Sequence, residues 1–374
     1  MEEKKVKSYT NFSMIVFILL IICGCLCALL VYQVMQVSLY VDINIYVFDV
    51  IVLIVGYIFA TTLYYVGKLI MGKLSGYRLI SFNLWFLNIV RDDKNKLVVK
   101  RGGFSGLGCK VYMAPKKDNP NYKLYLLGGT IFSLPIFIIC WLVALLIKNP
   151  EVDVKYYLLF ISGFIPFIIL ANLIPLRFDS NSDGFILRLI HADKTPDNYH
   201  RTLKQLEALT NGKSELKYYD ISSPKTPFDL DTLYYNYYYL IDHEEFTKAN
   251  RVCETLIENT SNITDLSKIY LGYTGKIYEL CRQKRFEESD RYFWELKHDI
   301  RKVVRNKWNF ESLKICLYVA AYMETNYDEY LNLYYRKDKL SKRYSYFCRA
   351  KLEEKIIDDT IKAIQVDHPD WYVE

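Results

Sequence analysis

The feature that most constrains this chain is a set of four long segments without a charged residue, all in its first half. They are Ser8–Val41, Val50–Gly67, Leu124–Ile147 and Tyr156–Leu176. About 20 consecutive apolar residues cross the hydrocarbon core of a bilayer as a helix. No comparable segment follows Leu176, and charged residues become frequent there. The pattern predicts a membrane-spanning first half and a soluble helical second half, and it excludes a fully soluble enzyme and a secreted disulfide-linked protein.

The basic residues that flank these segments predict their orientation. The segment Lys73–Lys123 carries eleven Lys or Arg against three Asp, Met1–Thr10 carries three Lys, and Ser38–Tyr46 has no basic residue. Because an excess of Lys and Arg marks the cytoplasmic side, we expect a multi-pass cell-membrane protein with four spans and both termini in the cytoplasm. The lipid bilayer is therefore its first partner. The same rule accounts for the net charge of +6, so the charge does not indicate a nucleic-acid partner.

A stretch rich in β-forming residues interrupts the predicted helices between the second and third spans. Tyr77–Val90 and Lys96–Arg101 are joined by the polar residues Arg91-Asp92-Asp93-Lys94-Asn95. Strand-like runs on either side of such a turn are typical of a β-hairpin. We therefore expect a small hairpin inserted at about residues 77–121.

The second half of the chain shows a loose internal repeat. Aromatic residues that follow a polar turn recur at Phe246, Phe286 and Tyr327, with spacings of 40 (286 − 246) and 41 (327 − 286) residues. The predicted helix–turn–helix stretches are Leu233–Ile257, Ile269–Leu296 and Leu313–Tyr334. They weakly resemble tetratricopeptide hairpins, whose period is 34 residues. Two interpretations stay open, namely aromatic stripes buried against one another or a peptide-binding groove. A last helix, at about 344–364, is expected to close the stack.

Together these patterns predict a mostly α-helical chain in three parts. We expect residues 1–44 to form an N-terminal anchor helix and an outer loop. Residues 45–190 form a membrane core of three spans with the inserted β-hairpin. Residues 191–374 form a cytoplasmic α-helical, repeat-like domain.

Three segments of the membrane half, in this order, resemble the site-2-protease-like M50 metallopeptidases. They are YYVGKLIMGKLSGYRLISF (Tyr64–Phe82), LGGTIFSLP (Leu127–Pro135) and NLIPLRFDSNSDG (Asn172–Gly184). They are similar to the family's three core helices, which carry H-E-x-G-H, a glycine-rich line and an N-x-x-P…D-G signature. The predicted hairpin lies where the family places a membrane-associated sheet. The resemblance covers under half of the chain.

The match to this family is degenerate at the metal ligands. With Gly67 aligned on the family's glycine, Tyr64 and Lys68 replace the two zinc-binding histidines and Tyr65 replaces the catalytic glutamate. The third ligand, Asp183, is retained. A Lys ammonium has no lone pair for a metal, and a protonated Tyr is a poor ligand. The other residues that match the family's motifs are Gly67, Gly128, Gly129, Ser133, Asn172, Pro175 and Gly184.

We therefore expect no catalytic residue, no zinc and no other cofactor. All five histidines follow the fourth predicted span, so none can replace the missing ligands. Tyr64 and Lys68 are four residues apart and share a helix face, which Asp183 should meet if the fold holds. Lys68 then either pairs with Asp183 or extends towards the inner membrane surface.

The resemblance implies an inactive, protease-like membrane protein that binds a peptide or a transmembrane client, together with a possible cytoplasmic partner. The alternative is an accessory subunit of a peptide-export or immunity system, with a transporter as its partner. A third hypothesis is an active peptidase of unusual chemistry, with a desolvated Lys or Tyr as its base or nucleophile. No Ser/Lys or Cys/His pattern in the sequence favours this third hypothesis.

Overall fold

The computed structural model describes residues 43–85, 87–92, 94, 96–101, 109–147, 153–175, 182–193, 196–260, 266–343 and 347–371. They form two compact units, one within Met1–Ile89 and Gly102–Asp197 and the other within Val90–Arg101 and Asn198–Glu374. We call them the N-terminal unit and the helical unit. The segment expected as the first span, Ser8–Val41, lies outside the described residues. The expected mostly helical fold with a small antiparallel sheet is confirmed.

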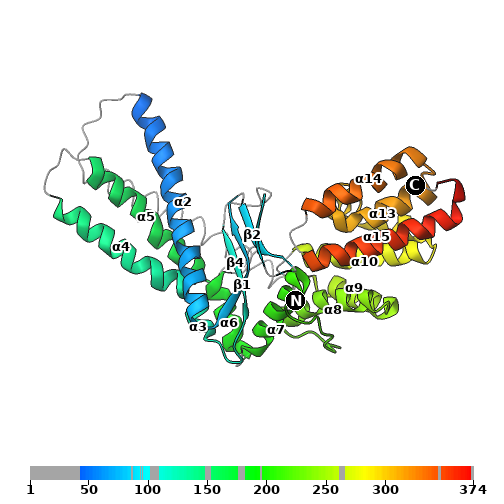
Figure 1. Cartoon of the computed structure of the whole chain (residues 1–374), viewed down its shortest axis with the longest axis horizontal. Helices are drawn as coiled ribbons and strands as arrows, with labels where there is room; N and C mark the ends of the chain where they lie inside the picture. Colours follow the sequence, from blue (N-terminus) through cyan, green and yellow to red (C-terminus); the bar gives the residue numbers. More distant parts are fainter. Residues whose placement is uncertain are drawn as a thin grey trace. The chain divides into compact units, whose positions relative to one another are not determined.

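Three long helices make the frame of the N-terminal unit. They are α2 (Ile43–Leu74), α4 (Gly128–Leu146) and α5 (Asp153–Leu173). Helix α2 packs against both α4 and α5, as Figure 1 shows. Two shorter helices complete the unit. Helix α3 (Tyr122–Leu126) directly precedes α4, and α6 (Asp183–Asp193) follows α5.

Glycines allow α2 and α4 to approach closely. A Cβ atom added to Gly67 of α2 would lie 2.5 Å from the Cβ of Phe132 in α4. A Cβ atom added to Gly129 of α4 would lie 2.5 Å from the Tyr64 ring in α2. Small residues let two helix backbones come together where helices pack in a membrane. The glycines of the first and second motif segments thus have a packing role that needs no metal.

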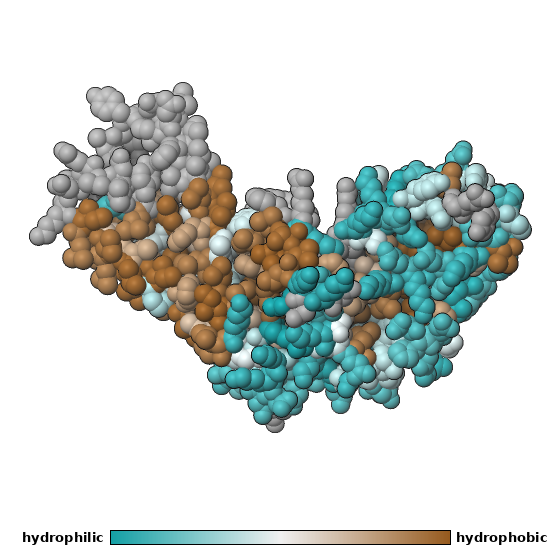
Figure 2. All heavy atoms as spheres, in the orientation of Figure 1, coloured by the Kyte–Doolittle hydropathy of each residue, from teal (hydrophilic) through white to brown (hydrophobic). Residues whose placement is uncertain are grey.

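The outer surface of these helices is apolar. Two helical segments, Leu53–Leu74 with 22 residues and Gly128–Leu146 with 19, are long and apolar enough to cross a membrane. Most of both segments is not buried in the protein, and Figure 2 shows the hydrophobic colour over this region. Large apolar side chains are exposed on α2 at Leu53, Ile54, Val55, Ile58 and Phe59. The corresponding apolar part of α5, Leu158–Leu173, is shorter.

The inserted region is a four-stranded sheet, larger than the predicted hairpin. Its strands are β1 (Tyr77–Leu84), β2 (Leu87–Arg91), β3 (Leu97–Arg101) and β4 (Lys110–Pro115), in the order β3-β2-β1-β4. The predicted single strand Tyr77–Val90 is divided at Trp85, whose φ of 57° turns the chain. Strand β4 was not predicted. It pairs antiparallel with β1, from Tyr77 opposite Pro115 to Asn83 opposite Lys110.

The helical unit is built from helices that pair as hairpins. The first helices are α7 (Asp197–Asn211), α8 (Pro227–Asp242) and α9 (Phe246–Glu258). They are followed by α10 (Leu266–Arg282), α11 (Phe286–Glu295), α12 (His298–Val304) and the 3-10 turn η2 (Phe310–Ser312). The remaining elements are α13 (Leu313–Tyr318), the π-helix η3 (Val319–Met323), α14 (Tyr327–Arg343), α15 (Phe347–Asp367) and η4 (Pro369–Trp371).

The repeat seen in the sequence corresponds to three turns of similar geometry. Phe246, Phe286 and Tyr327 each begin the second helix of a hairpin. Two residues before each of them, Glu244, Lys284 and Thr325 have positive φ angles of 59°, 60° and 48°. The Glu245 and Arg285 amides donate to Leu240 and Leu280, whereas the Asn326 amide donates to Ala320, one residue further back. The π-helix η3 holds this extra residue, since a π-bulge accommodates a one-residue insertion.

Phe286 is less buried than the repeat suggests. A core position would be expected for this aromatic, yet its side chain is only partly buried and stacks on Tyr322 with the ring centroids 4.4 Å apart. The fully buried position is three residues later in each hairpin, at Ala249, Ser289 and Tyr330. The cause is helix geometry, because the first residue of a helix lies at its end and the fourth returns to the inner face.

The C-terminal helix α15 packs on the last hairpin, formed by α13 and α14, and it also reaches α8. Figure 1 shows it beside α13. The Glu353 carboxylate of α15 is fully buried, 2.7 Å from Lys314 Nζ of α13, and accepts a hydrogen bond of 3.3 Å from the Tyr238 hydroxyl of α8. One side chain thus connects three helices. Burial raises the pKa of Glu353, and the neighbouring Lys314 ammonium opposes this shift.

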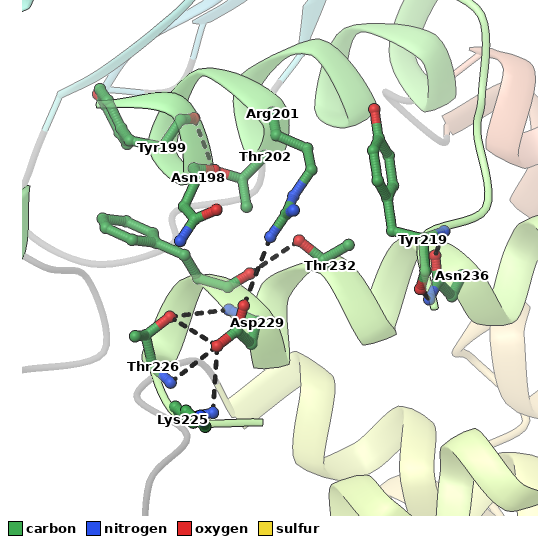
Figure 3. Close-up of polar contacts among 11 residues, drawn as sticks. Asn198, Tyr199, Arg201, Thr202, Tyr219, Lys225, Thr226, Asp229, Thr232 and Asn236 are labelled. Atoms are coloured by element: carbon green, nitrogen blue, oxygen red, sulfur yellow. Dashed lines mark hydrogen bonds and ion pairs between the residues drawn. The ribbon is translucent and has the colours of Figure 1, made fainter. Parts of the chain in front are cut away.

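A polar network fixes the join between α7 and α8 (Figure 3). Thr226 and Asp229 form a capping box at the start of α8, in which each side chain accepts from the other residue's amide. Arg201 of α7 donates to the other oxygen of Asp229 at 3.4 Å. Its guanidinium lies 4.9 Å from the centroid of the Tyr219 ring. These contacts hold α7 on the hairpin stack.

Candidate functional site

Asp183 is the centre of a buried polar cluster in the N-terminal unit. The Lys68 ammonium forms an ion pair with its Oδ1 atom, and the Tyr64 hydroxyl donates a hydrogen bond of 2.9 Å to its Oδ2 atom. The exposed fractions of Tyr64, Lys68 and Asp183 are 0%, 7% and 3%. The structure therefore brings together three of the positions that the sequence singled out, and Lys68 does not extend to the surface.

Helix α2 presents the two donors of this cluster. Tyr64 and Lys68 are one helical turn apart, so both side chains project from the same face of α2. The Lys68 ammonium also lies 5.1 Å from the centroid of the Tyr125 ring in α3. The Tyr125 hydroxyl donates 3.1 Å to the carbonyl of Val111 in β4. A cation over an aromatic face is stabilised electrostatically, and no pattern in the sequence indicated this contact.

The turn before α6 positions Asp183, which is the first residue of that helix. The hydroxyl of the preceding residue, Ser182, accepts a hydrogen bond of 3.2 Å from the Phe185 amide and donates one of 2.7 Å to the Ile174 carbonyl. A Cβ atom on Gly184 would lie 1.8 Å from the carbonyl oxygen of Leu173. Only glycine permits this approach of α6 to the end of α5. The D-G pair of the third motif segment thus has a direct structural cause.

The other motif positions lie around this cluster in less direct roles. Tyr65 donates to the side-chain oxygen of Asn172 at 3.4 Å, and Asn172 in turn donates to the Ile168 carbonyl at 2.9 Å. Gly128 lies against Met71 of α2. Ser133 is buried, and its hydroxyl has no partner among the described residues.

A zinc ion does not fit the residues around Asp183. Both carboxylate oxygens are occupied by donors, and the two neighbouring groups are an ammonium and a phenol rather than imidazoles. Within the described ranges, no group of three or more His, Cys, Asp or Glu side chains is placed to hold a metal. The arrangement neutralises a buried carboxylate, and the two donors occupy both of its oxygens.

The helical unit holds a second buried charge cluster that sequence reasoning missed. Beside the Lys314–Glu353 pair, the Arg349 guanidinium lies 2.5 Å from Glu311 and 4.7 Å from the centroid of the Tyr238 ring. Such a buried pair is weak evidence for added stability, but removal of one partner would leave an uncompensated buried charge. The only signal in the sequence was the charged run Glu353-Glu354-Lys355 within an otherwise amphipathic helix.

No protein-family model matches the chain, and no curated protein and no solved structure is significantly similar to it. The function is therefore inferred from the geometry of the chain's own residues.

Proposed function

We propose that this chain is a catalytically inactive, site-2-protease-like membrane protein that binds a peptide or transmembrane client. In this proposal it crosses the cell membrane four times, with both termini in the cytoplasm. The observation that carries the proposal is the convergence of Tyr64, Lys68 and Asp183. These are the positions that the resemblance assigns to the metal ligands, and they meet at one buried point although Asp183 is 115 residues from Lys68.

The charge of Lys68 explains how such a core persists without a metal. A buried carboxylate needs a nearby positive charge, because an isolated charge in a low-dielectric interior is strongly unfavourable. The Lys68 ammonium provides that charge to one oxygen of Asp183, and Tyr64 donates to the other. The helices can then keep their arrangement as a scaffold, and a hydrolytic role is lost with the imidazoles.

The helical unit supports a role in binding rather than in chemistry. Stacked helical hairpins are a common scaffold for protein recognition. In this unit α15 packs against α8 and α13, the first helices of two hairpins, so a partner could reach α15, the second helices and the hairpin turns. We therefore propose that a cytoplasmic partner binds this unit while the client binds the membrane core.

The second candidate is an accessory subunit of a peptide-export or immunity system. The exposed apolar side chains of α2 and α4 favour it, because helices of a partner could cover them as well as lipid tails could. An active enzyme based on Lys68 or Tyr64 has less support. Both groups already donate to Asp183, which leaves neither prepared as a nucleophile.

Purification of the tagged chain in a mild detergent separates these candidates. A short peptide or a single membrane client recovered with the chain supports the proposal, whereas a stoichiometric transporter component supports the accessory role. The double variant Lys68→Met/Asp183→Asn is a useful comparison, since it removes both charges without changing the surface. Metal analysis is the second test. One tightly held zinc per chain, lost on Asp183→Asn, would overturn the proposal.

A further inference from the structure

Two tryptophans and three lysines are exposed in the segment that runs from the end of α11 to the turn after α12. Trp294 and Trp308 are 62% and 58% exposed, and Lys297, Lys302 and Lys307 are exposed between them. We call these five residues the α12 surface. On its opposite side α12 is anchored in the core of the helical unit by Ile300 and Val304, so the surface is supported by a packed helix.

Each tryptophan has an arginine over one face of its ring. The Arg301 guanidinium lies 5.1 Å from the centroid of the Trp294 ring, and the Arg336 guanidinium lies 4.0 Å from that of Trp308. These cation–π contacts hold the two indoles in place without burying them. The other face of each ring remains in water, and burial of that face against a partner would be favourable.

The charge around the two tryptophans is positive. From Trp294 to Trp308 the chain has five Lys or Arg and two acidic residues, Glu295 and Asp299. Arg305 is paired with Asp290 at 2.7 Å, and Lys307 lies 3.4 Å from Glu329. Lys297 and Lys302 have no ion pair within the part of the chain that the structure describes. With the paired acids Asp290 and Glu329 included, the five basic residues face four acidic ones, and the small positive excess favours a negatively charged partner.

We propose that the α12 surface docks on an anionic lipid bilayer. Tryptophan favours the interface between membrane and water, where its ring is apolar and its N–H remains hydrated. Basic side chains close to an anionic leaflet are attracted to it. The inference rests on the membrane insertion in the proposed function, because spans in the same chain keep the helical unit near a bilayer and raise its effective concentration there. An acidic peptide would satisfy the lysines but would leave the indoles in water.

Hydrogen exchange of the full chain in nanodiscs tests this docking. Nanodiscs of phosphatidylcholine alone are compared with nanodiscs of equal parts phosphatidylcholine and phosphatidylglycerol. We expect amide exchange in residues 294–308 to slow by about tenfold with the anionic lipid, given the attraction of three lysines. The triple variant Lys297→Glu/Lys302→Glu/Lys307→Glu should lose this effect. The matched control Lys204→Glu/Lys248→Glu/Lys362→Glu has the same net charge and should keep it.

Two further outcomes decide the matter. Equal exchange in both kinds of nanodisc, or slowing that appears only when polyglutamate is added, would overturn lipid docking. The variant Trp294→Ala/Trp308→Ala tests the contribution of the indoles. If its amides exchange as slowly as those of the unmodified chain on the anionic nanodiscs, the contact depends on charge alone and the proposal is contradicted. Failure of membrane insertion is detected separately, by extraction of the chain from membranes with alkaline carbonate. In that event, sedimentation of the chain with vesicles of the same two compositions tests the α12 surface by itself.

Discussion

Lys68 and Asp183 form a buried ion pair between α2 and the start of α6, although 115 residues separate them in the sequence. The Tyr64 hydroxyl donates to the second oxygen of the Asp183 carboxylate, so side chains of α2 donate to both of its oxygens. A pair of this kind joins two distant segments and is sensitive to the loss of either partner. Removal of one charge leaves the other uncompensated, whereas removal of both need not be costly.

Replacement of Lys68 by Met should destabilise the N-terminal unit by about 3–5 kcal/mol, because Asp183 would stay buried without its counter-charge. The double variant Lys68→Met/Asp183→Asn should recover most of this loss. Lys73→Met is the matched control, since Lys73 is exposed on the same helix. Unfolding of the detergent-purified chain, followed by tryptophan fluorescence, gives the comparison. Equal effects of Lys68→Met and Lys73→Met would show that the pair does not form.

Replacement of Gly184 by Ala should disrupt the entry into α6, because the new Cβ would lie 1.8 Å from the Leu173 carbonyl oxygen. A clash with backbone cannot be relieved by a rotamer change, so we expect at least about 2 kcal/mol of destabilisation or loss of the folded chain. Gly163 in α5 provides the control, since a Cβ there meets nothing within 4 Å. Gly163→Ala should be neutral or slightly stabilising. The yield and melting temperature of both variants in detergent measure the difference.

Cysteines of the helical unit should differ in reactivity. Burial raises the pKa of the thiols of Cys253 and Cys316 to about 12 and that of Cys281 to about 11. A raised pKa reduces the thiolate, which is the form that reacts, so these three should resist iodoacetamide at pH 8. Cys348, which is only partly buried, should react first. Mass spectrometry of the alkylated chain shows the order. Rapid labelling of Cys253 in the folded chain would contradict its buried position.

Replacement of Thr325 by Gly should stabilise the third hairpin by about 1 kcal/mol. Thr325 has a φ of 48°, and a β-branched residue is strained in this left-handed region, whereas glycine is not. The same change at Thr255, within α9, should destabilise by a similar amount. Hydrogen exchange of α14 and α9 in the full chain reports each effect locally. If both variants lost protection, the positive φ at residue 325 would be wrong.

The proposed topology predicts where reporter domains will be found. Fusions after Val41 and after Glu151 should place the reporter outside the cell, and fusions after Asn95 and at the C-terminus should place it inside, because the basic segments lie at the latter sites. Paired reporters, one active on each side of the membrane, provide the internal control. A C-terminal reporter found outside would contradict the four-span arrangement.

The sequence alone predicted the features that depend on local composition and period. The apolar segments predicted the helices α2, α4 and α5. The recurrence of Phe246, Phe286 and Tyr327 predicted where three further helices begin. It also indicated that Tyr64 and Lys68 share a face, because their spacing is one helical turn. Each of these depends only on neighbours within a few residues, so the chain encodes them locally.

The tertiary structure decided which distant groups meet. The sequence left open whether Lys68 pairs with Asp183 or reaches the surface, and the answer depends on how α6 packs after α5, which Gly184 permits. Strand β4 was missed because its pairing partner β1 lies across a long connection. Likewise the role of Glu353 depends on its contacts with Lys314 and Tyr238, which lie on other helices. Local pattern determines the elements, whereas contacts between residues far apart in the sequence determine how the elements join, because such contacts exist only in the packed chain.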